Sequence, residues 1–198
     1  TAVSKRLLEA ADLLVVDTEG RKVSGRMRPF SELGLHRAVY SARPDVAAVL
    51  HAHPPNATGF ALAGVPLFDP PTSPEPVVSL GPGIPTVGYA PPGAGAEAAL
   101  APVARAHNAA LLANHGVMTW GPDLETAFLR MELVEHIARC TVVAHQLGGP
   151  KPIPEADVRA LDEKRIKAGL APPGVGETDD ARIADVIGRE VARALRRG

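Results

Sequence analysis

Two short apolar runs in this chain each lead into histidine, and this pattern constrains the fold more than any other feature. The run 46–50 is followed by His51 and His53, and the run 109–113 precedes His115 by one residue. Short apolar runs of this kind, bounded by turn residues, are typical of buried strands. Because side chains alternate along a strand, His51 and His53 point to the same face. The pattern therefore predicts three imidazoles at one end of a sheet.

Three protein ligands with one open position are typical of a catalytic zinc ion, whereas a structural zinc ion has four. We therefore predict that His51, His53 and His115 bind a divalent metal ion. Zn²⁺ is the expected ion, and Mn²⁺ or Co²⁺ would suit the same ligands. Histidines that only complete hydrogen bonds at strand ends are the alternative explanation.

Composition indicates an ordinary globular protein. The 198 residues suit one domain, or one domain with an appendage. A formal net charge of -1 gives no electrostatic basis for binding nucleic acid or an anionic membrane. No apolar run approaches the length of a membrane span. Cys140 is the only cysteine, which excludes an intrachain disulfide and favours a cytoplasmic location. Its place among apolar residues predicts that it fills the core.

The remaining elements follow from turn and capping residues. Residues 13–17 and 21–24 predict a hairpin around Gly20, and Ser31 is the expected N-cap of the next helix. Residues 64–93 are rich in proline, which indicates a functional or interface loop containing one short strand over 84–89. Further helices are expected over 55–63, 96–106, 124–147, 155–168 and 179–196, and a further strand over 117–120.

Three segments together resemble the class II aldolase/adducin family: Pro29-Phe30-Ser31-Glu32, His51-Ala52-His53-Pro54 and Leu111–Gly116. The resemblance covers residues 1–148, without a region that usually precedes it in the family, and leaves 149–198 as a helical C-terminal extension. It implies a three-layer α/β/α fold around a mixed, largely antiparallel sheet. It also implies a homotetramer with active sites between adjacent subunits.

The resemblance also implies roles for individual residues. Histidines at the positions of His51, His53 and His115 bind zinc in the family. Glu32, nineteen positions before His51, matches a carboxylate that acts as acid and base. Ser31, Phe30 and Asn114 are the expected substrate contacts. Phe30 stands where the family has a phosphate-binding hydroxyl, so we expect a weaker preference for phosphorylated substrates.

The expected reaction follows from the chemistry of such a site. Cleavage of a carbon–carbon bond next to a carbonyl leaves a carbanion, which a divalent ion on the carbonyl oxygen stabilises as an enolate. We therefore predict an aldolase-type lyase acting on a sugar phosphate or a hydroxy acid. The alternatives are a decarboxylase of a non-phosphorylated hydroxy or aromatic-derived acid, a pentulose-phosphate 4-epimerase, and a non-enzymatic adducin-like interaction protein.

Overall fold

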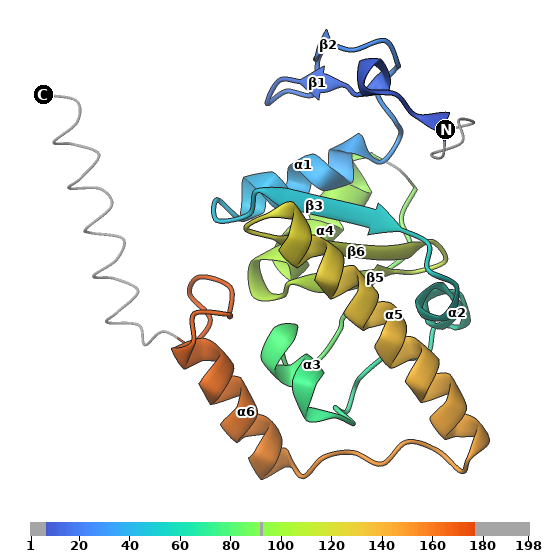
Figure 1. Cartoon of the computed structure of the whole chain (residues 1–198), viewed down its shortest axis with the longest axis vertical. Helices are drawn as coiled ribbons and strands as arrows, with labels where there is room; N and C mark the ends of the chain where they lie inside the picture. Colours follow the sequence, from blue (N-terminus) through green and yellow to red (C-terminus); the bar gives the residue numbers. More distant parts are fainter. Residues whose placement is uncertain (1–6, 92, 177–198) are drawn as a thin grey trace, which may run out of the picture.

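The computed structural model describes residues 7–91 and 93–176. Helices pack on both sides of a central sheet, and a small hairpin stands apart from this body near the start of α1 (Figure 1). The strands are β1 (Val15–Val16), β2 (Lys22–Ser24), β3 (Ala48–Ala52), β4 (Thr86–Val87), β5 (Ala109–Leu112) and β6 (Gly116–Gly121). The helices are the short 3-10 turn η2 (Ala10–Asp12), α1 (Leu33–Ala42), α2 (Pro55–Ala63), α3 (Pro74–Ser79), α4 (Ala94–Ala106), α5 (Leu124–Gln146) and α6 (Glu155–Lys167).

The central sheet has the strand order β3-β6-β5-β4. β6 pairs antiparallel with both β3 and β5, and only β4 and β5 run parallel. The predicted mixed, largely antiparallel sheet is therefore confirmed. The register pairs Ala52, the last residue of β3, with Val117 near the start of β6. This pairing brings the histidines at the end of β3 next to the turn that carries His115.

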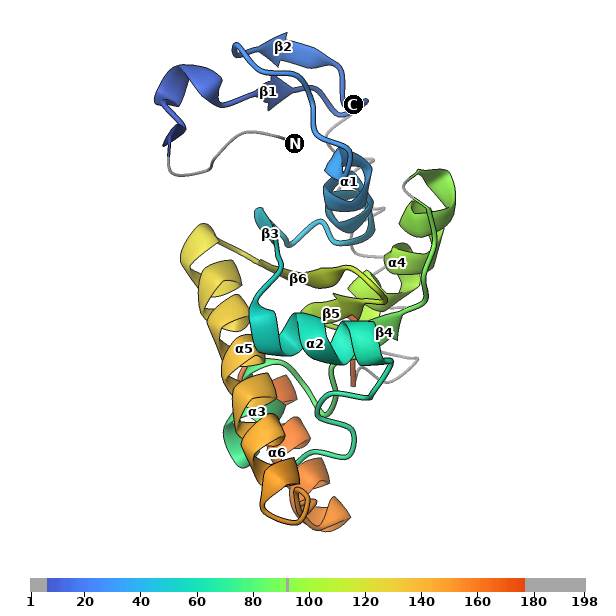
Figure 2. The same cartoon turned by 90° about the vertical axis from the view of Figure 1, so that its right-hand side faces the viewer.

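Successive residues of β5 face opposite sides of the sheet. Ala109 and Leu111 belong to a core formed with α2, α3 and α5, whereas Ala110 and Leu112 belong to a second core formed with α1 and α4. In Figure 2 the pair α2 and α5 is separated from the pair α1 and α4 by the strands. Helices cover both faces, so consecutive residues of a strand are apolar. The predicted three-layer α/β/α arrangement is confirmed.

The predicted elements are mostly present, but two details of the prediction were wrong. The predicted hairpin is formed by β1 and β2, which pair antiparallel. The helix expected after Ser31 is α1, yet its N-cap is Glu32. The Ser31 hydroxyl instead donates a hydrogen bond to Glu32 Oε1 at 2.8 Å. The proline-rich stretch contains the predicted strand as β4, and also α3, a helix that begins with Pro74 and was not expected.

The long helix α5 corrects the prediction for Cys140, which is exposed. The buried stripe of α5 includes Ala127, Met131, Val134 and Ala138, at helical spacing. Cys140 lies two residues beyond Ala138, about 200° further round the helix, and so falls outside this stripe. Across the described ranges, α5 included, no helix is long and apolar enough to span a membrane.

The first part of the C-terminal extension packs against the main body. Val158 and Leu161 of α6 contact the core on the α2 and α5 side of the sheet. Before α6, the backbone N–H of Ile153 donates to the carbonyl of Pro71 at 2.9 Å. The division of the chain at residues 148 and 149 stays a prediction, and the helix expected over 179–196 lies outside the described residues.

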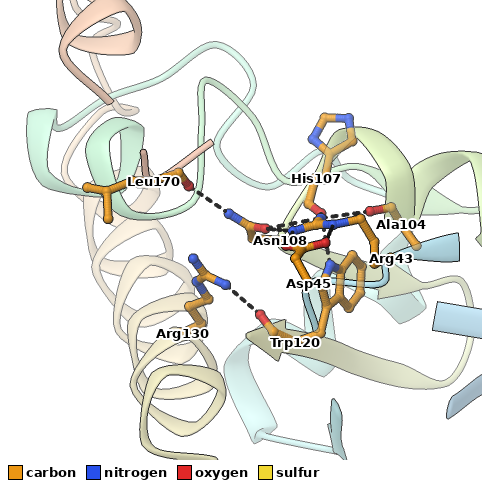
Figure 3. A network of polar contacts seen from close by, with 8 residues as sticks. All are labelled: Arg43, Asp45, Ala104, His107, Asn108, Trp120, Arg130 and Leu170. Carbon is orange, nitrogen blue, oxygen red and sulfur yellow. Dashed lines mark hydrogen bonds and ion pairs between the residues drawn. The ribbon is translucent and has the colours of Figure 1, made fainter. Parts of the chain in front are cut away.

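Arg43 joins several segments of the chain in the network of polar contacts shown in Figure 3. This network lies at the end of the sheet away from His115, since Asn108 directly precedes β5 whereas His115 follows it. Its side chain is buried, with 5% of the residue exposed. Arg43 Nη1 donates to the carbonyls of Ala104 and His107, each at 3.0 Å, where α4 ends. Nε and Nη2 each lie 2.7 Å from a carboxylate oxygen of Asp45, and Asn108 Oδ1 accepts from Nη1 and Nη2 at 3.3 Å. One guanidinium therefore connects the end of α1 with the end of α4 and with the residues that precede β3 and β5.

We expect Arg43→Met to lower the free energy of unfolding by about 3 kcal/mol, because it leaves a carboxylate and buried carbonyls without their charged donor. Urea denaturation of the full chain measures this as a lower midpoint at an unchanged slope. Arg105→Met, at an exposed position of α4, is the matched control and should change stability by less than about 0.5 kcal/mol. Equal stability of the two variants would contradict the role given to Arg43.

Candidate metal centre

The three predicted histidine ligands meet at one end of the sheet. His51 is the fourth residue of β3, His53 follows the end of that strand, and His115 lies in the turn between β5 and β6. The ring centroids are 4.6 to 5.0 Å apart, and His51 Nε2 lies 3.0 Å from His53 Nε2. One ligand nitrogen from each ring lies within 4.8 Å of the other two.

The spacing of these nitrogens suits a tetrahedral metal ion. Two nitrogens on one zinc ion are about 3.3 Å apart, because each lies about 2.0–2.1 Å from the metal. The pair His51 and His53 is already close to this separation, and the ligand nitrogen of His115 lies within 4.8 Å of both. Within the part of the chain that the structure describes, no second group of His, Cys, Asp or Glu side chains meets the same criterion. The residues present therefore fit a divalent ion.

His51 is held in the tautomer and charge state that bind a metal. Its Nδ1–H donates to the carbonyl of Val117 at 3.0 Å, which leaves the lone pair of Nε2 directed at the cluster. Burial lowers the pKa of His51 to about 4, the bond to Val117 opposes this, and the neighbouring His115 and His53 lower the pKa further. The imidazole is therefore neutral at neutral pH, as a metal ligand must be.

Asn114 and Gly116, on either side of His115, bring this histidine close to the other two. Asn114 has a φ of 58°, in the left-handed region where asparagine is tolerated better than most residues. A Cβ atom on Gly116 would lie 2.5 Å from His53 Cδ2 and 2.7 Å from the carbonyl oxygen of Ala52. Only glycine allows the two segments to approach so closely.

Glu32 lies near the histidine cluster, at the start of α1. Burial raises the pKa of its carboxyl group, but the hydrogen bond from the Ser31 hydroxyl, a hydrogen bond from the backbone of Glu32 and the proximity of His51 and His115 together outweigh this effect. The net result is a pKa below the usual value for glutamate. The carboxylate is therefore ionised at neutral pH and able to accept a proton.

The three predicted substrate contacts have different surroundings. Ser31 and Asn114 both line a cavity that His115 also lines. Phe30 is not among the residues that line it. The Phe30 ring instead packs edge-on against His36, with centroids 5.3 Å apart, and the residue is 39% exposed.

The cavity has a volume of about 230 Å³ and lies between the start of α1, the start of α4 and the turn before β6. Its lining includes Glu32, His115, Tyr89 and a second carboxylate, Glu97. Glu97 lies against the backbone of α1, because a Cβ atom on Gly34 would be 2.0 Å from Glu97 Oε1. Glu97 is not recognisable from the sequence, since α4 reaches the cavity only by packing beside α1.

Comparison with known proteins places these features in a family. The family model "Class II Aldolase and Adducin N-terminal domain" matches residues 1–142. A 5-deoxy-D-ribulose 1-phosphate aldolase of Bacillus thuringiensis is 30% identical over 155 residues, which cover 77% of this chain and 71% of that protein. An L-fuculose phosphate aldolase of Methanococcus maripaludis is 31% identical over 142 residues, which cover 71% of this chain and 74% of that protein.

Solved structures give the same result. The chain superimposes on an L-fuculose 1-phosphate aldolase with a TM-score of 0.75 and 27% identity, over 83% of this chain and 76% of that one. It superimposes on YgbL of Klebsiella pneumoniae with a TM-score of 0.70 and 32% identity, over 78% of this chain and 75% of that one. The similarity extends over most of the described residues.

Proposed function

Because this chain belongs to the class II aldolase and adducin family, we propose that it is a divalent-metal-dependent lyase that cleaves a carbon–carbon bond next to a carbonyl group. One observation carries the proposal: three imidazoles converge near the ionised carboxylate of Glu32, where a cavity opens. The proposed substrate is a small molecule, either a sugar phosphate or a hydroxy acid.

His51, His53 and His115 are the proposed ligands of a zinc ion, and manganese or cobalt would suit the same nitrogens. When bound, the ion would act as a Lewis acid that polarises the substrate carbonyl and stabilises developing negative charge. The neutral state of His51 supports this assignment, because uncharged ligands leave the full charge of the ion available to the substrate.

Glu32 is the proposed acid and base. The carboxylate lines the cavity near the histidines and is ionised in the free protein, so it can take a proton from a substrate held there. The hydrogen bond from the Ser31 hydroxyl at 2.8 Å holds one carboxylate oxygen in a defined orientation. In this proposal, Glu32 moves a proton at the substrate carbon next to the carbonyl.

Product analysis tests the proposed reaction. The full chain, loaded with zinc, would be incubated with a panel of ketose phosphates and hydroxy acids. Cleavage into an aldehyde and a second carbonyl compound is the expected result. Release of carbon dioxide would instead favour the decarboxylase, and inversion at one carbon without cleavage would favour the 4-epimerase. A purified chain that binds no transition metal and converts no substrate would favour an adducin-like interaction protein.

The charge of the cavity bears on the class of substrate. Glu32 and Glu97 line it, and no Lys or Arg is found among the described residues of the lining. A phosphate dianion usually requires several hydrogen-bond donors and is repelled by a carboxylate. We therefore propose that the end of the substrate facing Glu97 is neutral, or that a phosphate group at this end strengthens substrate binding only slightly.

Glu97→Gln should raise kcat/KM for a ketose phosphate, relative to its dephosphorylated analogue, by about tenfold, because it removes one negative charge from the cavity. The ratio of kcat/KM for the two compounds measures the effect independently of the amount of active enzyme. Glu125→Gln, at an exposed position of α5, is the control and should leave the ratio unchanged. A thousandfold preference of the unaltered chain for the phosphorylated compound would contradict this role of Glu97.

A homotetramer is the proposed assembly, with active sites between adjacent subunits. Exposed apolar side chains on α2 and α5 support a subunit interface there: Leu62, Val142 and Val143 are 58%, 37% and 48% exposed. Burying such side chains against another subunit would be favourable. A cytoplasmic location stays a prediction that rests on the single cysteine, Cys140.

A further inference from the structure

Glu135 of α5 contacts the segment that follows the first two histidines. Its Oε1 accepts hydrogen bonds from the backbone N–H of Asn56 at 3.1 Å and from Asn56 Nδ2 at 2.7 Å. Its Oε2 accepts from the backbone N–H of Ala57 at 2.9 Å. Both oxygens of this partly buried carboxylate are therefore used as acceptors by residues seventy-eight and seventy-nine positions away.

These contacts supply an N-terminal cap that α2 cannot supply itself. The N-cap position is Pro54, whose side chain has no hydrogen-bonding atom, and Pro55 follows as the first residue of the helix. The next two backbone N–H groups, of Asn56 and Ala57, are unpaired within the helix, as at the start of any helix. A carboxylate at this end is favourable, because it also interacts with the positive end of the helix dipole.

The capped segment begins directly after a proposed metal ligand. The pairing of β3 with β6 ends at Ala52, so His53 lies between the last paired residue of the strand and the start of α2. Two consecutive prolines, Pro54 and Pro55, restrict the backbone between His53 and the capped residues. The position of Asn56 therefore strongly limits the position of the His53 ring, which packs tightly against Gly116.

We propose that Glu135 is a positioning residue of the metal centre: by anchoring the start of α2, it holds His53 at the distance from His51 that an ion requires. The proposal rests on the proposed function, since it takes the three histidines to be metal ligands. Glu135 itself touches neither the histidines nor the cavity beside them in the contacts described. It acts through the backbone of residues 53–57.

Glu135→Gln provides the test, because an amide is nearly the same size but replaces one acceptor oxygen by a donor. At least one of the three hydrogen bonds is then lost. Glu132→Gln is the matched control, since Glu132 lies one turn earlier on α5 and is exposed. The zinc affinity of each full-length chain would be measured by competition with a chelator, and the visible absorption spectrum would be recorded with cobalt in place of zinc.

For Glu135→Gln we expect zinc affinity to fall by about ten- to a hundredfold, the usual effect of losing a group that orients a metal ligand. The cobalt spectrum should change, whereas Glu132→Gln should retain the affinity within twofold and an unaltered spectrum. If Glu135→Gln fails to fold, Asn56→Ala provides the test of the proposal, because it removes only the hydrogen bond from Asn56 Nδ2 to Glu135. This variant should weaken zinc binding by several-fold.

Two outcomes would overturn the proposal, and they are distinguishable. If Glu135→Gln unfolds more easily but retains its zinc affinity and cobalt spectrum, Glu135 only stabilises α2. If the unaltered chain binds neither zinc nor cobalt, the proposed metal centre, the proposed function and the role of Glu135 are all wrong. An unaltered chain that binds zinc tightly but cleaves no substrate would contradict the proposed reaction and leave the role of Glu135 intact.

Discussion

His53→Ala is expected to abolish metal retention and catalysis together. The variant leaves two imidazoles where three converge, and two ligands hold a divalent ion far more weakly. The loss of affinity should exceed the ten- to hundredfold effect that removal of an orienting group has. Because a Lewis acid contributes several kcal/mol to a reaction of this type, we expect kcat/KM to fall by about a thousandfold or more. Metal content after dialysis and initial rates on the same preparation measure the two effects.

The control for His53→Ala is His145→Ala. His145 is exposed near the end of α5, away from the cluster, so its removal should leave both metal content and rate unchanged. Retention of a full equivalent of zinc by His53→Ala would show that the metal has other ligands. An equal loss of activity in both variants would indicate that histidine loss acts through stability alone.

Glu32→Gln is expected to separate metal binding from turnover. Glu32 is not one of the three side chains whose ligand atoms meet, so the variant should retain its metal. An amide cannot accept and return a proton, so kcat should fall by about 10²- to 10⁴-fold, the usual contribution of a positioned acid or base. Metal analysis and steady-state kinetics on one sample provide the measurement.

Ser31→Ala is a useful companion to Glu32→Gln. It removes the hydrogen bond from the hydroxyl to Glu32 Oε1 but leaves the carboxylate in place, so its effect on kcat should be much smaller. A near-normal rate for Glu32→Gln would remove Glu32 from the reaction and leave it only as the N-cap residue of α1.

Local sequence determined which segments of this chain form strands and helices. The apolar runs 46–50 and 109–113 lead to β3 and β5, and the period of the apolar residues in 124–147 leads to α5. These features are predictable because they depend on residues that are neighbours along the chain. Histidines follow both runs directly or after one residue, and this pattern predicts a metal centre.

The tertiary structure alone decided how closely those histidines approach and what surrounds them. The 3.0 Å separation of His51 Nε2 and His53 Nε2 depends on the bond from His51 to Val117 and on the absence of a side chain at Gly116. The contact of Glu135 with the start of α2 joins residues seventy-nine positions apart. The periodicity of apolar residues along the chain cannot predict such a contact.

The local sequence pattern also did not determine the surroundings of individual side chains. Ser31 has the residue type of an N-cap, but its hydroxyl is used by the Glu32 carboxylate. Cys140 has apolar neighbours in sequence but lies off the buried stripe of α5, whose position is set by the sheet beneath it. A side chain's environment depends on which elements pack together, and packing joins parts of the chain that are distant in sequence. The sequence by itself therefore determined the elements and the residue types available for chemistry, whereas tertiary packing decided which of those residues meet.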